Sequence, residues 1–107
     1  MRNEKEAETA AKFLNKLGVK TPIITMGEQG AFLYKYGLIP AFNVGEVVET
    51  TGAGDAFNGG FAVALSEGKS AFEAVKFGCA TASISVTRAG TAPSMPARDE
   101  VENILLI

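Results

Sequence analysis

The chain has 107 residues, of which 47% are hydrophobic and 21% are charged. This length and composition predict one compact unit with a buried core and exclude a disordered or fibrous protein. Ten lysines and arginines stand against twelve aspartates and glutamates, and the net charge of -2 gives no overall field that would attract nucleic acid or an anionic membrane.

The first predicted element is an amphipathic helix over residues 4–17 with Gly18 as its C-cap. Its apolar residues recur at spacings of three and four and are expected to face the core: Ala7, Ala10, Leu14 and Leu17. A short β-branched run at residues 22–26 then predicts a buried strand.

Turn residues dominate positions 27–30 and separate the first strand from two more, predicted at residues 31–36 and 38–42. The three strands would form a small antiparallel meander. Pro40 favours an edge position because proline cannot donate a hydrogen bond to a neighbouring strand. Residues 46–48 are a candidate for one further short strand.

Three helices are predicted in the second half of the chain. The first starts in a glycine-rich segment and reaches residue 65, with Phe57, Phe61 and Leu65 on one face. Ser70 followed by Glu73 has the pattern of a capping box, which predicts a helix to about residue 87 with Gly90 beyond its end. Its small residues, 78–83, permit close packing on a neighbouring helix. The last helix begins near Pro96 and directs Val101, Ile104 and Leu105 towards the core.

Cys79 is the only cysteine, and the chain has no histidine. An internal disulfide and a Cys/His zinc site are therefore excluded, and a reducing compartment is expected. The first residues are charged, and no stretch approaches the ~20 apolar residues that cross a bilayer. These features predict a cytoplasmic protein without a membrane partner.

The segment most informative about function is residues 51–55, Thr-Gly-Ala-Gly-Asp. Glycines at the start of a helix allow backbone amides to converge on an anion that the helix dipole also favours. The segment is not a Walker A loop, because no lysine follows the glycines. A pair of glycines is often only a turn, so this pattern alone leaves a purely structural role open.

Asp55 follows these glycines in the first helical turn. It has a structural interpretation, as an N-capping or dipole-stabilising residue. Beside an anion site it can instead accept the proton of a hydroxyl that attacks a phosphorus atom, since phosphoryl transfer needs orientation more than strong prior deprotonation. Gly59 and Gly60 are costly inside a helix. They indicate a close approach, either by a ligand or by Ala80, Ala82 or Ser83 of the next helix.

Residues 49–61, with Gly52, Ala53, Gly54 and Asp55 at their centre, resemble the C-terminal signature of the ribokinase family, D-T-x-x-A/G-G-D-x-F-x-x-G. The resemblance continues through residues 23–30 and 86–94, and the latter segment is more similar to ribokinase than to other members. It covers essentially the whole chain, but only the C-terminal part of a family whose members are about three times as long.

The resemblance implies an α/β fold, a three-layer α/β/α architecture represented by its C-terminal portion, over residues 1–107. It implies ATP-dependent phosphorylation of a sugar hydroxyl, with D-ribose as the expected sugar and ATP, Mg²⁺ and K⁺ as cofactors. Asp55 would be the catalytic base and contact the sugar, and the amides of Gly52, Ala53 and Gly54 would form an anion hole. The residues that would border the ATP site are Thr25, Gly27, Glu28, Gln29, Gly30, Gly54 and Cys79.

A monovalent cation site is implied beside the anion hole, on residues that include several backbone carbonyls: Glu49, Thr51, Ser85, Arg88, Gly90 and Ser94. Two positions depart from the family pattern. Glu49 stands in place of the usual aspartate, one methylene further from the loop. Cys79 stands where ribokinases often have a histidine near the adenine, and its alternative interpretation is a small buried hydrophobic residue.

The sugar site and the N-x-x-E motif that helps place magnesium belong to the family's N-terminal part, which this sequence does not contain. A non-catalytic nucleotide-binding or interaction module therefore stays open as an alternative function, as do fructokinase and adenosine kinase. Without the N-terminal strands, one edge or face of the sheet is expected to be uncovered, which favours self-association.

Overall fold

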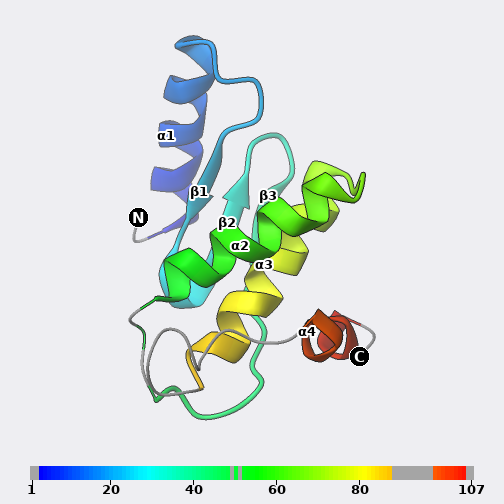
Figure 1. Ribbon diagram of the computed structural model, residues 1–107. Helices are drawn as coiled ribbons and strands as arrows, with labels where there is room; N and C mark the ends of the chain where they lie inside the picture. The colour runs from blue at the N-terminus through cyan, green and yellow to red at the C-terminus, as the bar shows by residue number, and fades with distance from the viewer. Residues whose placement is uncertain (1–2, 49, 51, 88–97, 106–107) are drawn as a thin grey trace.

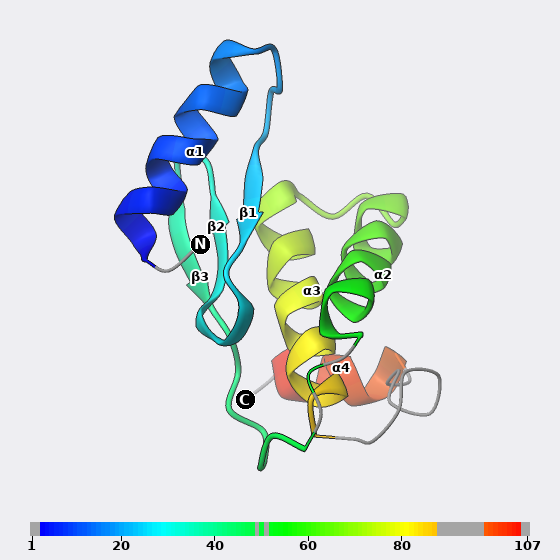
Figure 2. The ribbon, with the colours of Figure 1, turned by 90° about the vertical axis from the view of Figure 1, so that its left-hand side faces the viewer.

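A computed structural model describes residues 3–48, 50, 52–87 and 98–105, and these residues form three layers. Helix α1 (Glu4–Lys16) covers one face of a three-stranded sheet, and α3 (Ala71–Ser85) covers the other (Figure 2). Helix α2 (Ala53–Ser66) packs along α3, and α4 (Arg98–Leu105) packs against α3 as well (Figure 1). The predicted three-layer α/β/α architecture is confirmed.

Helix α1 begins where Asn3 caps it, because the Asn3 side chain accepts a hydrogen bond of 2.8 Å from the Glu6 amide. Its buried residues are Ala7 and Ala11, which pack with Met26 and Phe32. The prediction that Leu17 faces the core is wrong, since Leu17 ends the helix and is 68% exposed. The last turn of α1 extends past the ends of the strands, where there is no sheet surface to cover (Figure 2).

The sheet consists of β1 (Ile23–Thr25), β2 (Gly30–Leu33) and β3 (Gly37–Pro40), antiparallel in the order β1-β2-β3. A short 3₁₀ helix, η1 (Gly27–Gln29), joins β1 to β2. Side chains alternate between the two faces: Phe32 packs in the cluster under α1, whereas Leu33 packs in the cluster with α3. The strands are shorter than predicted. As expected, β3, which ends at Pro40, is an edge strand.

Helix α3 starts with the predicted capping box, in which the Ser70 hydroxyl accepts from the Glu73 amide at 3.2 Å. Helices α2 and α3 approach each other closely at Gly60 and Gly78. A Cβ atom at Gly78 would lie 2.9 Å from the ring of Phe57, and one at Gly60 would collide with Thr81. Helix packing therefore accounts for Gly60, as the structural alternative proposed, but the residues that approach it most closely are Thr81 and Gly78 and not Ala80, Ala82 or Ser83.

The candidate strand at residues 46–48 is wrong, since these residues are irregular. The Val48 amide donates instead to the carbonyl of Val86, at 2.7 Å, so its partner is the end of a helix and not a strand. In α2, Phe57 is buried but Leu65, predicted to share its face, is 44% exposed because Ala64 occupies the core position.

In α4, Val101 is buried as expected and Leu105 is partly buried against the same cluster. The predicted start near Pro96 and the side chain of Ile104 lie outside the described residues. None of the helices in the described ranges is long and apolar enough to cross a membrane.

Candidate functional site

The N-terminus of α2 begins at a glycine and has no side chain that caps it. Gly52 is the N-cap residue, with φ 88° in the left-handed region that glycine adopts readily, and no side chain forms a capping hydrogen bond there. The Ala56 amide donates to the Gly52 carbonyl at 2.9 Å, and the Ala53 amide donates to the Thr50 carbonyl at 3.2 Å. One of the three predicted anion-hole amides, that of Ala53, is thus already used within the chain.

Gly54 differs from Gly60 of the same helix and from Gly78 of α3. A Cβ atom built on Gly54 would meet no heavy atom of the described residues within 4 Å, and Gly54 is not among their positive-φ positions. Neither packing nor backbone strain requires glycine here, whereas both Gly60 and Gly78 are required by packing. Because glycine in a helix costs stability relative to alanine, its presence at an exposed helix start needs a different reason.

Asp55 lies in the first turn of α2 and is exposed. The N-cap position belongs to Gly52, so the interpretation of Asp55 as an N-capping residue is wrong. Its carboxylate still lies at the positive end of the helix dipole. An exposed carboxylate there can accept a proton from a substrate that binds in front of the helix.

The turn between β1 and β2 carries the other group of predicted residues. Thr25 ends β1, and residues 27–29 form η1; all four are exposed, whereas Gly30 is buried. In two perpendicular views η1 and the first turn of α2 lie at the same height in the molecule (Figure 1 and Figure 2). Two segments far apart in the sequence therefore lie at the same level of the fold, above α4 in these views.

Cys79 does not belong to this exposed surface. Its side chain is 3% exposed and packs in the core cluster with Leu33, Ile39 and Phe57. The thiol lies 3.8 Å from the Ile39 carbonyl oxygen, and burial raises the pKa of Cys79 to about 11. This placement agrees with the alternative interpretation, a small buried hydrophobic residue.

Of the predicted cation site, the structure describes only Ser85, the last residue of α3, which is 1% exposed. The other five residues lie outside the described part of the chain: Glu49, Thr51, Arg88, Gly90 and Ser94. Among the residues that are described, no group of three or more cysteine, aspartate or glutamate side chains could hold a metal ion.

The contacts that hold the loop before α2 were not predicted from the sequence. The Phe42 amide donates to the Ser83 hydroxyl at 3.0 Å, and the Val48 amide donates to the Val86 carbonyl at 2.7 Å. Both partners lie near the end of α3. Among the small residues 78–83, the hydroxyls of Thr81 and Ser83 indicated possible polar contacts, but nothing in the sequence identified the partner of Ser83.

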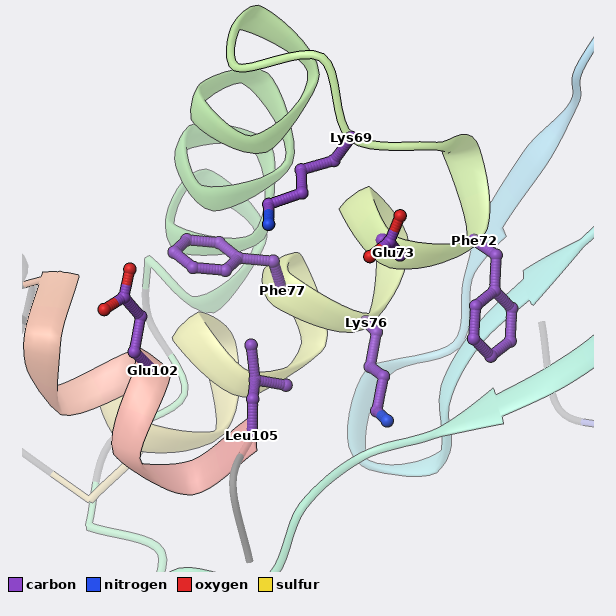
Figure 3. Close-up of a pocket in the computed structure, with 7 residues that line it drawn as sticks. All are labelled: Lys69, Phe72, Glu73, Lys76, Phe77, Glu102 and Leu105. Atoms are coloured by element: carbon purple, nitrogen blue, oxygen red, sulfur yellow. The ribbon is translucent and has the colours of Figure 1, made fainter.

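A pocket of about 490 Å³ lies elsewhere, between α3 and α4 (Figure 3). It is lined by apolar side chains and by charges of both signs: Lys69, Phe72, Glu73, Lys76, Phe77, Glu102 and Leu105. It contains none of the predicted site residues. Since its two lysines and two glutamates balance in charge and no glycine-rich loop of the described residues borders it, the start of α2 remains the better candidate for an anion.

The chain is similar to known proteins over nearly its whole length. The family described as pfkB family carbohydrate kinase matches residues 1–98. The ribokinase of Haemophilus influenzae is 43% identical over 106 residues, which are 96% of this chain and 34% of that protein. The chain thus spans about a third of the length of this curated relative.

Two solved structures have the same fold. A ribokinase from Thermotoga maritima superposes with a TM-score of 0.86 at 51% identity, covering 94% of this chain and 34% of that one. The ribokinase of Arabidopsis thaliana, complexed with ribose and ATP, superposes with a TM-score of 0.84 at 39% identity, covering 92% and 33%. The chain belongs to the pfkB family of carbohydrate kinases.

Proposed function

We propose that residues 1–107 are the C-terminal nucleotide-binding part of an enzyme that transfers the γ-phosphoryl group of ATP to a sugar hydroxyl, with D-ribose as the sugar. The observation that carries this proposal is Gly54, a glycine at an exposed helix start that neither packing against the described residues nor backbone conformation requires. A phosphate that binds close to the helix start would explain why this position is glycine. The ribokinases among the relatives, one of them solved with ribose and ATP, support the choice of substrates.

The chemistry follows from the order of groups at this helix start. The sugar hydroxyl attacks the γ-phosphorus, the new O–P bond forms as the bond to ADP breaks, and Asp55 accepts the hydroxyl proton. The amides of Gly52 and Gly54 stabilise the charge on the transferred group, and the Ala53 amide joins them by sharing its hydrogen with the Thr50 carbonyl. Thr25 and residues 27–30 border the nucleotide.

The two metal ions belong to the same proposal. Mg²⁺ would neutralise the charge of the phosphates. The described residues offer no acidic cluster. We therefore assign its ligands to the nucleotide and to residues in the part of the relatives that this chain does not span. K⁺ would lie beside the anion hole and order its loop, with Ser85 as the one described member of its site.

Two alternative functions would give a different activity. A non-catalytic nucleotide-binding module would keep Gly54 and Asp55 but transfer no phosphoryl group. A fructokinase or adenosine kinase would keep the same nucleotide site and accept a different hydroxyl. The choice among sugars therefore depends on residues outside this chain.

Gly54→Ala tests the nucleotide site. Because a methyl group has room in the chain and alanine favours a helix, the variant should be as stable as the unaltered chain or more stable by up to ~1 kcal/mol. The same methyl group should obstruct a phosphate, so the affinity for ADP measured by calorimetry should fall by ~10-fold or more.

Asn58→Ala is the matched control, one turn further along α2 and also exposed, and should leave the ADP affinity unchanged. Titration of the unaltered chain with ADP should shift the amide resonances of residues 52–55. Unchanged resonances at millimolar nucleotide, or equal ADP affinity in Gly54→Ala, would contradict the proposed site.

A further inference from the structure

Two hydrogen bonds hold the loop between β3 and α2 against the C-terminal end of α3. At its start the Phe42 amide donates to Ser83 Oγ at 3.0 Å, and later the Val48 amide donates to the Val86 carbonyl at 2.7 Å. Between them Gly45 lies beside Thr87, and a Cβ atom on the glycine would be in van der Waals contact with Thr87 Cγ2 at 3.4 Å. The loop therefore follows the last turns of α3 before it leads to the start of α2.

Ser83 is the only side chain in these two hydrogen bonds. Its hydroxyl donates to the Cys79 carbonyl within α3 at 2.7 Å and accepts from the Phe42 amide. Ser83 is 6% exposed, so water has little access to replace it. Removing the hydroxyl would leave the partly buried Phe42 amide without its acceptor, a loss that mutational data show to be costly.

The same stretch is held on its other side by the turn that carries the candidate nucleotide residues. The Ala41 amide donates to the Gln29 carbonyl at 3.3 Å, and the next amide, that of Phe42, donates to Ser83. Two consecutive amides thus connect η1 with α3. Displacing Phe42 would move both the η1 contact and the beginning of the loop that leads to Gly52.

We propose that Ser83 is a positioning residue: its hydroxyl holds the junction of η1, β3 and α3 and so sets the spacing between η1 and the start of α2. The role rests on the proposed function, because these two segments are the ones assigned to the nucleotide. Ser83 itself contacts no substrate. Its removal should therefore weaken nucleotide binding by more than its effect on stability explains.

Thr81 provides a matched comparison on the same helix. Its hydroxyl makes the same type of bond, to the Phe77 carbonyl at 2.8 Å, and it is 5% exposed, but it makes no bond to the described residues of the loop. Thr81→Val removes this hydroxyl and keeps the side-chain volume. If Ser83 had only a structural role, removal of its hydroxyl would change the ADP affinity no more than Thr81→Val does.

The experiment measures the ADP affinity and the hydrogen-exchange rate of the Phe42 amide in Ser83→Ala, Ser83→Thr and Thr81→Val of the full chain. Ser83→Ala should weaken ADP binding by ~10-fold and accelerate Phe42 exchange by at least as much, as expected for one lost hydrogen bond. Ser83→Thr keeps the hydroxyl and should restore both values, while Thr81→Val should change neither. If Ser83→Ala does not fold, Ser83→Cys replaces it, since a thiol keeps the volume and accepts hydrogen bonds weakly.

Unaltered ADP affinity in the variant without the hydroxyl would overturn the role of Ser83, as would an equal loss of affinity in Thr81→Val. Absence of nucleotide binding by the unaltered chain would overturn the proposed function and the role of Ser83 with it. The two failures are therefore distinguishable.

Discussion

Gly30 and Gly27 delimit the turn that carries the candidate nucleotide residues, and their surroundings differ. Gly30 has φ 113°, and a Cβ atom there would collide with the Ile39 carbonyl and lie 2.7 Å from the Ala41 amide nitrogen. Gly27 has φ 58° and open space around it. The first position combines backbone strain with a steric clash against a neighbouring strand, whereas the second has strain alone.

Gly30→Ala should therefore destabilise the chain by ~3 kcal/mol or more, and Gly27→Ala by only ~1 kcal/mol, the cost of placing a non-glycine residue in the left-handed region. Urea unfolding of the two variants measures the difference. Equal losses would mean that the strands separate enough to accommodate a methyl group.

Cys79 makes stability depend on alkaline pH. Burial raises its pKa from 9.0 to about 11. Between these values the unfolded chain releases the thiol proton while the folded chain retains it, so the unfolded state binds fewer protons and stability falls as pH rises. Below pH 9 the thiol is protonated in both states and contributes no pH dependence.

The free energy of unfolding should accordingly fall by an amount of the order of 2 kcal/mol between pH 9 and 11 from this group. The measured quantity is the difference between the unaltered chain and Cys79→Ala, a difference that removes the contributions of all other groups. Parallel stability curves for the two proteins would contradict the raised pKa.

At the scale of elements, the contact between α2 and α3 depends on glycine where the helices are closest. Alanine at position 78 would gain ~1 kcal/mol of helix propensity. Its Cβ atom would lie 2.9 Å from two ring carbons of Phe57 and 3.0 Å from the Phe57 carbonyl oxygen. The steric cost should exceed the gain, because neither the ring nor the backbone is free to move in a packed core.

Gly78→Ala should thus lower the free energy of unfolding by ~1–3 kcal/mol in urea titrations. The same change in a Phe57→Leu background should cost less, since the clashing ring is gone. Strictly additive losses in the double variant would show that Phe57 is not the source of the strain.

At the scale of the whole molecule, the chain spans about a third of its curated ribokinase relative from Haemophilus influenzae. Large apolar side chains are exposed in the described part, among them Phe13 at 61%, Leu17 at 68% and Val48 at 61%.

Positioning supplies most of the catalysis of phosphoryl transfer, and the proposed base needs a sugar hydroxyl held in line with the γ-phosphate. A nucleotide site alone is therefore insufficient for turnover.

We expect negligible D-ribose phosphorylation by this chain alone, and clear activity when it is joined to the remaining two thirds of a ribokinase-like protein. In that complete protein Asp55→Asn keeps the shape of the side chain but removes the proton acceptor. Turnover should fall by ~100-fold or more with little change in ATP affinity, as for loss of a general base. Near-normal turnover in the asparagine variant would refute the role of Asp55.

The sequence by itself determined the elements that depend on local chemistry. The capping box predicted the start of α3, the turn residues 27–30 and Gly37 predicted the meander, and the motif at residues 49–61 predicted the family. Each of these signals lies within a few residues of the structure that it specifies, because capping, turn conformation and strand alternation are local properties.

Tertiary structure alone decided which residues are covered and which backbone groups find distant partners. Leu17 continues the helical spacing of apolar residues but lies past the end of the sheet. Val48 is a residue type typical of strands, but its amide donates to the carbonyl of Val86 at the end of α3. Ser83 is one small residue among several until folding brings Phe42 to it from 41 positions away. No local pattern encodes such contacts, since they form only where the layers meet.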